Sequence, residues 1–158
     1  MTRGPATDGS GGRSAARSSI GLLLALVAAL GLVIAAYLTW TKLNGLVPPC
    51  LPGGGCATVE ASDYSSLGGI PVAAFGVVYS AAMLLLGLAC WRDGGRQARL
   101  LVYGLGLAGV LVEAYLVYLE LFVIHAVCLW CAAYGLTVVL GFALAAWQLS
   151  RPGRASAR

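Results

Sequence analysis

The chain has 158 residues, enough for one domain. Hydrophobic residues make up 59% of it and charged residues 10%, whereas an average soluble domain has about 45–50% and about 25%, with Gly in place of Tyr in the apolar count. A soluble globule of this size cannot bury so much apolar surface, so the composition excludes an ordinary soluble domain and favours the bilayer as solvent. The net charge is +4, but the positions of the charged residues along the chain are more informative than this total. We expect no nucleic-acid partner.

Four stretches exceed the ~18 apolar residues of a transmembrane helix, at about 20–43, 70–91, 99–122 and 128–149. They predict an all-α integral membrane protein, with a four-helix bundle over 20–149 and a short tail over 150–158. The arginines flank these stretches on one side only: Arg3, Arg13, Arg17, Arg92, Arg96, Arg99, Arg151, Arg154 and Arg158. Lys42 alone lies on the other side. This asymmetry predicts a multi-pass protein of the cell (inner or plasma) membrane with both termini cytoplasmic.

Residues 1–19 are rich in Gly, Ser, Ala and Arg, and we expect a disordered cytoplasmic tail there. The apolar stretch that follows is too long for the core of a signal peptide, and no A-x-A-like cleavage site comes after it. We therefore expect a retained helix. Tyr37, Trp40 and Lys42 place its outer end at the depth of the lipid headgroups.

The outward loop, 44–69, carries Cys50 and Cys56 on either side of a Leu-Pro-Gly-Gly-Gly run. The glycines allow tight turns, so the loop can bring the two sulfurs together and can also move. A shuttling disulfide needs that freedom, while a structural staple, the alternative, does not. Further along the loop, Glu60–Leu67 is expected to form a short interfacial helix that ends at Gly68.

Two carboxylates and one histidine stand in or after the third apolar stretch. Glu113 is well inside it, which makes it a functional candidate, although a protonated Glu bonded to a neighbouring helix is the plainer interpretation. Glu120 is expected to be interfacial and solvated. His125 could move protons or stabilise a thiolate, or simply lie at the interface. Cys90 is expected to pack as a small apolar residue.

Cys128 and Cys131 open the last stretch, on the same outward side as the loop pair. At positions i and i+3 they share one helix face, and a helix beginning there favours a thiolate. A four-thiolate zinc site is possible in principle, but this side is the one where disulfides persist. Haem attachment requires His where Ala132 stands. The two pairs therefore predict a redox relay from solvent to the membrane edge, with no metal. No G-x-G-x-x-G follows a strand, so a membrane quinone is the natural acceptor.

Several pieces of the chain, in this order, resemble the bacterial form of the vitamin K epoxide reductase family. They span about residues 35–140 and comprise Cys50 with Cys56, Val59, Ser62–Ser65, Gly69–Pro71, Phe75 with Gly76, Tyr115 and Phe122–Cys131. The order also separates this chain from quinone-linked disulfide formers of the DsbB type, which carry C-x-x-C in the first outward loop.

The resemblance implies a catalytic role for all four cysteines of the two pairs. Cys131 would face the quinone, Cys128 would exchange with Cys56, and Cys50 would complete the loop disulfide that meets the partner. Ser62 would donate a hydrogen bond near the loop. Three aromatic residues could line the quinone pocket, with ordinary helix packing as the alternative: Phe75, Tyr79 and Tyr115.

Two positions depart from the animal members of that family. Val72 stands where they carry a quinone-bonding asparagine, which disfavours epoxide reduction. Gly135 stands where they carry a tyrosine, for which Tyr134 is a possible substitute. The predicted function is therefore a membrane thiol–disulfide oxidoreductase that oxidises a separate DsbA-like, thioredoxin-fold protein outside the cytoplasm. Its electrons would pass to menaquinone, ubiquinone or a vitamin K type quinone, in support of disulfide bond formation. A vitamin K quinone or epoxide reductase and a non-enzymatic membrane scaffold are the alternatives.

Overall fold

The computed structural model describes residues 10–50, 54–92 and 95–150, with side chains from Ser19 onward. The expectations for residues 1–9 and 151–158 lie outside this range. The elements, in chain order, are α1 (Ser10–Leu43), α2 (Cys56–Ala61), the 3₁₀ turn η1 (Asp63–Ser65), β1 (Ser66–Leu67), β2 (Ile70–Pro71), α3 (Val72–Arg92), α4 (Arg96–Tyr118), the π-helical segment η2 (Leu119–Ile124) and α5 (Leu129–Ser150).

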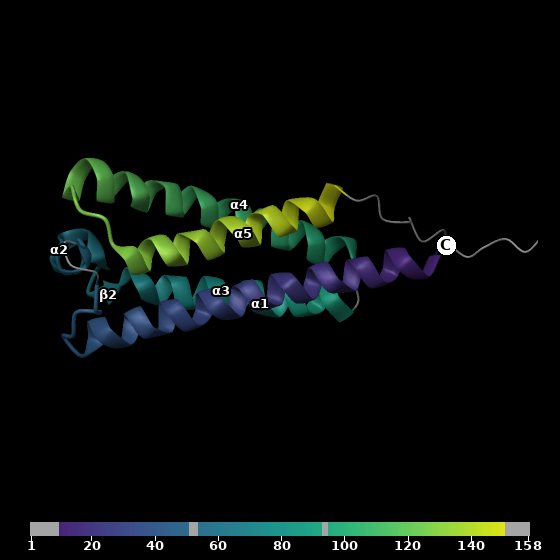
Figure 1. Cartoon of the computed structure of the whole chain (residues 1–158), viewed down its shortest axis with the longest axis horizontal. Helices are drawn as coiled ribbons and strands as arrows, with labels where there is room; N and C mark the ends of the chain where they lie inside the picture. Colours follow the sequence, from purple (N-terminus) through teal and green to yellow (C-terminus); the bar gives the residue numbers. More distant parts are fainter. Residues whose placement is uncertain (1–9, 51–53, 93–94, 151–158) are drawn as a thin grey trace, which may run out of the picture.

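Four of these helices form a bundle (Figure 1). The stretches long and apolar enough to cross a membrane are Ser19–Leu43, Val72–Arg92, Arg96–Ile124 and Leu129–Ser150. The all-α membrane fold predicted from the sequence is therefore confirmed. Within the bundle α1 packs mainly against α3, and α5 packs against both α4 and α1. The segments α2 and β2 lie at the end of the bundle where the chain passes from η2 to α5, opposite the free ends of α1 and α5 (Figure 1).

Two helices begin earlier than expected. The α1 helix begins at Ser10 instead of residue 20, so part of the expected disordered tail is helical. The α4 helix begins at Arg96 instead of residue 99. Residues 10–19 contain Ala and Arg, which favour helix, and no Pro, so a helix nucleated in the apolar stretch continues into them. Hydropathy marks where a helix enters apolar surroundings, whereas the helix itself ends where its backbone bonds end.

The expected interfacial helix at Glu60–Leu67 is wrong in its bounds. The helix is α2, which ends at Ala61, and β1 and β2 then form a small antiparallel hairpin. Gly68 and Gly69 make the hairpin turn with φ of 59° and 85°. Two successive residues with positive φ are what a two-residue hairpin turn requires, so the glycine pair encodes a hairpin instead of a helix end. We call the region from α2 to β2 the cap.

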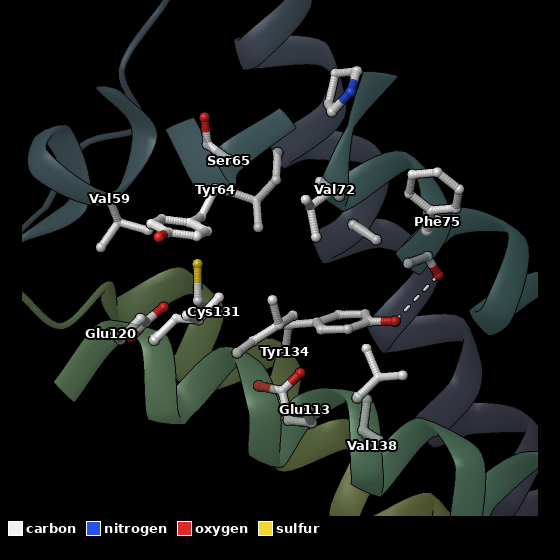
Figure 2. Close-up of a pocket in the computed structure, with 18 of the residues that line it drawn as sticks. Val59, Tyr64, Ser65, Val72, Phe75, Glu113, Glu120, Cys131, Tyr134 and Val138 are labelled. Carbon is white, nitrogen blue, oxygen red and sulfur yellow. Dashed lines mark hydrogen bonds between the residues drawn. The ribbon is translucent and has the colours of Figure 1, made fainter. Parts of the chain in front are cut away.

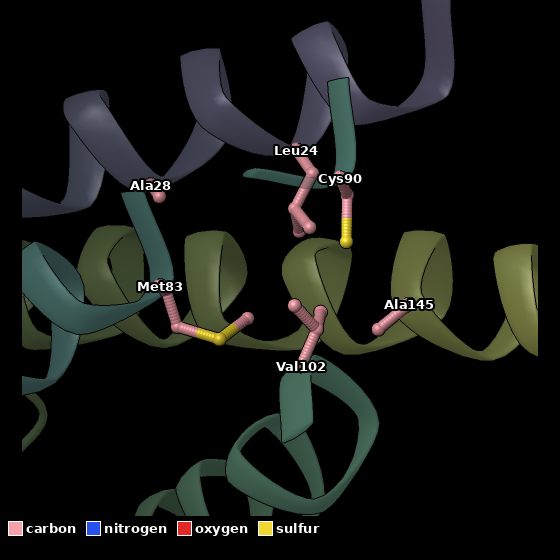
Figure 3. Packing of buried hydrophobic residues seen from close by; sticks show 6 residues of the cluster. All are labelled: Leu24, Ala28, Met83, Cys90, Val102 and Ala145. Carbon is pink, nitrogen blue, oxygen red and sulfur yellow. The ribbon is translucent and has the colours of Figure 1, made fainter. Parts of the chain in front are cut away.

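The end of the bundle away from the cap is closely packed. Its buried cluster draws on all four long helices and comprises Leu24, Ala28, Met83, Cys90, Val102 and Ala145 (Figure 3). A Cβ added at Gly21 would lie 2.7 Å from the backbone nitrogen of Trp91, so α1 and α3 touch backbone to backbone. Close packing of this kind, rather than the hydrophobic effect, holds helices together in lipid. Cys90 is 5% exposed and packs as a small apolar residue, as predicted.

Candidate functional site

The loop cysteines Cys50 and Cys56 are joined in a disulfide, with their Cα atoms 6.2 Å apart. Cys56 is the first residue of α2 and is buried. Residues 51–53 of the intervening loop lie outside the described range. The disulfide therefore links the segment that leaves α1 to the start of the cap.

The cap is tied to the end of α1 through Lys42. Its Nζ donates to the backbone oxygen of Glu60 at 2.5 Å and to Ser65 Oγ at 2.7 Å, and lies 3.3 Å from Glu60 Oε1. Lys42 was expected only to mark the headgroup depth at the outer end of its helix. It also binds α2 and η1 of the cap. Ser62, the serine singled out above, donates through Oγ to Val59 O at 2.7 Å and so closes the end of α2.

A single backbone bond docks the loop disulfide on the segment before α5. Gly55 N–H donates to Val127 O at 3.0 Å. These residues immediately precede Cys56 and Cys128, and both cysteines are buried, at 1% and 3% exposure. A Cβ on Gly55 would lie 2.7 Å from Ala126 Cβ and 2.8 Å from Val127 N, so glycine is required for this approach. The two cysteine pairs are thereby brought together.

The other end of the loop disulfide is held by Trp130. Its indole Nε1 donates to Pro49 O at 2.9 Å, and Pro49 immediately precedes Cys50. The ring also packs against Tyr37 of α1, with centroids 5.0 Å apart. The tryptophan inside the Cys-Leu-Trp-Cys run thus joins the residue before Cys50 to the start of α5.

Cys128 occupies the N-terminal end of α5. Its backbone oxygen accepts from Ala132 N at 2.9 Å, and its Sγ accepts from the backbone N–H of Cys131 at 3.3 Å. The hydrogen bond from the Cys131 thiol lowers the pKa of Cys128 below its usual value, which outweighs burial, and backbone N–H groups add to the effect. Cys128 and Cys131 are both free thiols here. Cys128 is therefore prepared to act as a thiolate.

The expectation that Glu120 is solvated is wrong, because its side chain is only 8% exposed. Its Oε2 accepts from the backbone N–H of Cys128 at 3.2 Å, and its backbone oxygen accepts from Ala126 N at 3.0 Å. A regular helix ending near residue 122 would not place Glu120 this way. The π-helical turn η2, closed by His125 in the left-handed region at φ 56°, folds the chain back so that Glu120 meets Cys128.

A cavity of about 300 Å³ lies between the cap and the long helices (Figure 2). Its wall is mostly apolar and includes three of the four residues proposed for a quinone pocket, Phe75, Tyr79 and Tyr134. The fourth, Tyr115, is 58% exposed and is not part of the wall. Cys131 lines the cavity and Cys128 does not. The two cysteines therefore differ in position, because only Cys131 contributes to the cavity wall.

The remaining proposed residues also differ in whether they line the cavity. Ser62 and Glu113 line the cavity, whereas His125 is exposed and lies outside it. Glu113 is 9% exposed, and a Cβ on Gly135 would meet its carboxyl group, so glycine makes room for the carboxylate on α5. No three His, Cys, Asp or Glu side chains come together as a metal site within the described ranges.

The cavity is suited to a small apolar ligand. Its apolar wall matches an uncharged planar molecule, and its volume is at the lower end of the ~300–1,000 Å³ typical of small-molecule pockets. Tyr79 Oη is buried without a hydrogen-bond partner among the described residues, so it can donate to a carbonyl oxygen. Tyr134 Oη already donates to Gly76 O at 3.2 Å and lies 3.3 Å from Ser80 Oγ. Sequence reasoning singled out both tyrosines, but it missed Glu120, Gly55 and the indole of Trp130, which no short motif marks.

A comparison with family models agrees with this geometry. The model of the vitamin K epoxide reductase family matches residues 22–146. The match includes most of the four long helices, the cap and both cysteine pairs. Proteins of this family are membrane oxidoreductases, linked in general to quinones and to thioredoxin-like partners. With most of its length matched and with the expected helical membrane fold, the chain belongs to the vitamin K epoxide reductase family.

Proposed function

We propose that the protein reoxidises a thioredoxin-fold protein outside the cytoplasm and passes the electrons to a membrane quinone, in support of disulfide bond formation. The observation that carries this proposal is the docking of Gly55 on Val127, which brings a loop disulfide against a buried dithiol. Because Cys131 of that dithiol lines the cavity, a path exists from the surface loop to an apolar pocket.

The chain's own residues account for the exchange steps. A partner thiolate attacks the Cys50–Cys56 disulfide, and a mixed disulfide forms and resolves. The freed Cys56 attacks Cys128 of an oxidised Cys128–Cys131 pair, because these two residues follow the docked backbone pair. Cys131 then leaves as a thiolate beside the cavity. Each step exchanges one disulfide for another, so electrons and atoms balance.

A bound quinone would supply the acceptor for two electrons and two protons as the Cys128–Cys131 disulfide forms again. Tyr79 would hold its carbonyl oxygen, and Phe75 and Tyr134 would pack against its ring. Val72, at the position of the animal asparagine, presents an apolar side chain to the same cavity, which favours plain quinone over epoxide as substrate. The one-sided arginine distribution supports an extracytoplasmic position for the cap.

The test is anaerobic quinone reduction by purified protein with a reduced thioredoxin-fold partner, with each of the four cysteines replaced in turn. Cys131→Ala should abolish quinone reduction and still trap a disulfide with the partner. Cys50→Ser should block the protein partner and spare a small dithiol. Turnover by Cys131→Ala, or equal loss with both reductants in Cys50→Ser, would overturn the proposal. Plain quinone and its epoxide, assayed side by side, settle the substrate.

A further inference from the structure

Glu120 is a buried carboxylate that contacts the Cys128–Cys131 segment. Its Oε2 accepts from the backbone N–H of Cys128 at 3.2 Å, which places the carboxylate at the start of the Cys128–Cys131 pair. Figure 2 shows Glu120 beside Cys131, with the sulfur of Cys131 pointing toward Tyr64 of the cap. Both side chains line the cavity.

We propose that Glu120 is the proton donor and acceptor for Cys131 during the exchange between the two cysteine pairs. This inference rests on the proposed function, since it names the group that moves the proton in that site. It does not depend on which quinone or which partner protein is used.

The proton balance of the opening step is simple. The Cys56 thiolate attacks Cys128 Sγ, the Cys128–Cys131 bond breaks, and protonated Glu120 gives its proton to the departing Cys131 sulfur. The products are a Cys56–Cys128 disulfide, a Cys131 thiol and a Glu120 carboxylate. In the reverse direction Glu120 takes the proton from Cys131, so that Cys131 becomes a thiolate when the pair is oxidised again.

The need for such a group follows from the geometry of the pair. In the reduced site the Cys131 thiol can donate to Cys128, whose sulfur is charged more readily than an ordinary thiol. Once Cys128 is held in a disulfide with the loop, that acceptor is lost. Glu120 then remains as the acceptor beside Cys131 in the cavity wall. A leaving thiolate in an apolar cavity without a proton source would be costly.

The other ionisable groups around the cavity do not take this place. Lys42 of α1 and Glu60 of the cap form the only ion pair among the described residues. Glu113 lies two turns earlier on α4 and packs against Gly135. Tyr79 of α3 and Tyr134 of α5 line the wall around Glu113, and His125 is exposed outside the cavity. No cation of the described chain therefore neutralises Glu120.

A purely structural role for Glu120 makes a different prediction, and the variant Glu120→Gln separates the two. The amide keeps an acceptor for the Cys128 N–H but cannot exchange a proton. Quinone-free, oxidised protein in detergent is mixed with a saturating small dithiol, quenched with acid and alkylated, and the opening of each disulfide is followed by mass spectrometry over a pH series.

We expect Glu120→Gln to slow the opening of Cys128–Cys131 by about 100-fold, the lower end of the range for general acid catalysis, and to remove part of its pH dependence. Opening of Cys50–Cys56 in the same samples should stay at the wild-type rate. Asp63→Asn, at an exposed carboxylate outside the cavity wall, should match wild type in both. Glu120→Asp keeps a carboxyl group, so it should open at an intermediate rate with its pH dependence kept, and it serves if Glu120→Gln folds poorly.

Glu120→Gln within twofold of wild type, with the same pH profile, would overturn the role of Glu120. Because no quinone is present, this result tests the role of Glu120 and leaves quinone reduction untouched. Failure of the wild-type protein to reduce any quinone would refute the proposed function and leave the Glu120 measurement standing.

Discussion

The two ends of the bundle are built on different principles. At the end away from the cap, helices touch through small residues, and the buried cluster contains no charged group (Figure 3). At the cap end the helices enclose a cavity. A few hydrogen bonds from Lys42, Gly55 and Trp130 join the cap and the loop disulfide to the helices. The packed end supplies rigidity, while the cap end combines buried thiols with contacts weak enough to exchange. The same kind of substitution should therefore lower the reaction rate at the cap end and the free energy of unfolding at the packed end.

Serine in place of cysteine should give the largest contrast. Cys128→Ser removes the sulfur that exchanges with the loop, so turnover should fall to the uncatalysed background with both a protein partner and a small dithiol. Cys90→Ser, in the packed cluster, should keep wild-type kcat and instead lower the free energy of unfolding by about 1–3 kcal/mol, because it buries a hydroxyl. Quinone reduction and detergent-titrated unfolding measure the two effects. Residual turnover in Cys128→Ser would remove it from the electron path.

Alanine in place of glycine gives the next contrast. Gly55→Ala should slow transfer between the cysteine pairs roughly 10- to 100-fold, because displacing reacting groups by about 1 Å can cost that much. Gly21→Ala should separate α1 from α3 and destabilise the protein by about 1–3 kcal/mol, with little change in the rate per folded molecule.

Gly104→Ala is the matched control for both glycine variants, since its added Cβ would meet nothing within 4 Å. Single-turnover exchange separates rate from stability in all three. Equal transfer rates in Gly55→Ala and Gly104→Ala would show that the docking of Gly55 is not needed for exchange.

The hydroxyl of Tyr79 gives a smaller effect confined to the cavity. Tyr79→Phe removes a buried hydroxyl that has no hydrogen-bond partner in the described part of the chain. We expect the KM for quinone to rise about 2- to 10-fold, the worth of one hydrogen bond, while stability is unchanged or slightly higher. Steady-state kinetics at varied quinone concentration, at fixed dithiol, give the KM. An unchanged KM together with higher stability would mean that the hydroxyl does not contact the quinone.

The pH dependence of Cys128 can be tested outside turnover. Because the Cys131 thiol lowers the pKa of Cys128, the Cys128 thiolate should persist below the pH at which an ordinary thiol is protonated. Cys131→Ala removes the largest cause, so the pKa of Cys128 should rise toward the usual value, and the thiolate should be lost at a higher pH. Ultraviolet absorbance of the thiolate against pH measures both proteins. Identical titrations would assign the effect to the helix end alone.

Removing the interactions of Lys42 with the cap should have the smallest effect. Its side chain and that of Glu60 are 24% and 22% exposed, and a partly exposed ion pair is worth less than about 1 kcal/mol. Lys42→Met should therefore barely change global stability and should speed hydrogen exchange in the cap, while Lys42→Arg should preserve most of the protection. Loss of global stability well beyond this would show that the cap and the bundle unfold together.

The sequence was most informative where one physical effect dominates. Apolar length predicted the four spans, and the order of Cys50, Cys56, Cys128 and Cys131 predicted a family that the comparison then showed. Element bounds in the cap were wrong because the Gly68-Gly69 pair is equally suited to end a helix and to turn a hairpin. The place of Glu120 could not be predicted, since it depends on the π-helical turn and on a tertiary bond to Cys128.

The most direct test of the account is the identity of the disulfide that joins the two pairs. In oxidised Cys131→Ala protein, Cys128 keeps a free thiol beside the Cys50–Cys56 disulfide. Cys128 should attack Cys56, so peptide mass spectrometry after acid quenching should find a Cys56–Cys128 disulfide and a free Cys50. A Cys50–Cys128 disulfide in its place, or an intact Cys50–Cys56 disulfide with free Cys128 at every pH, would contradict the relay.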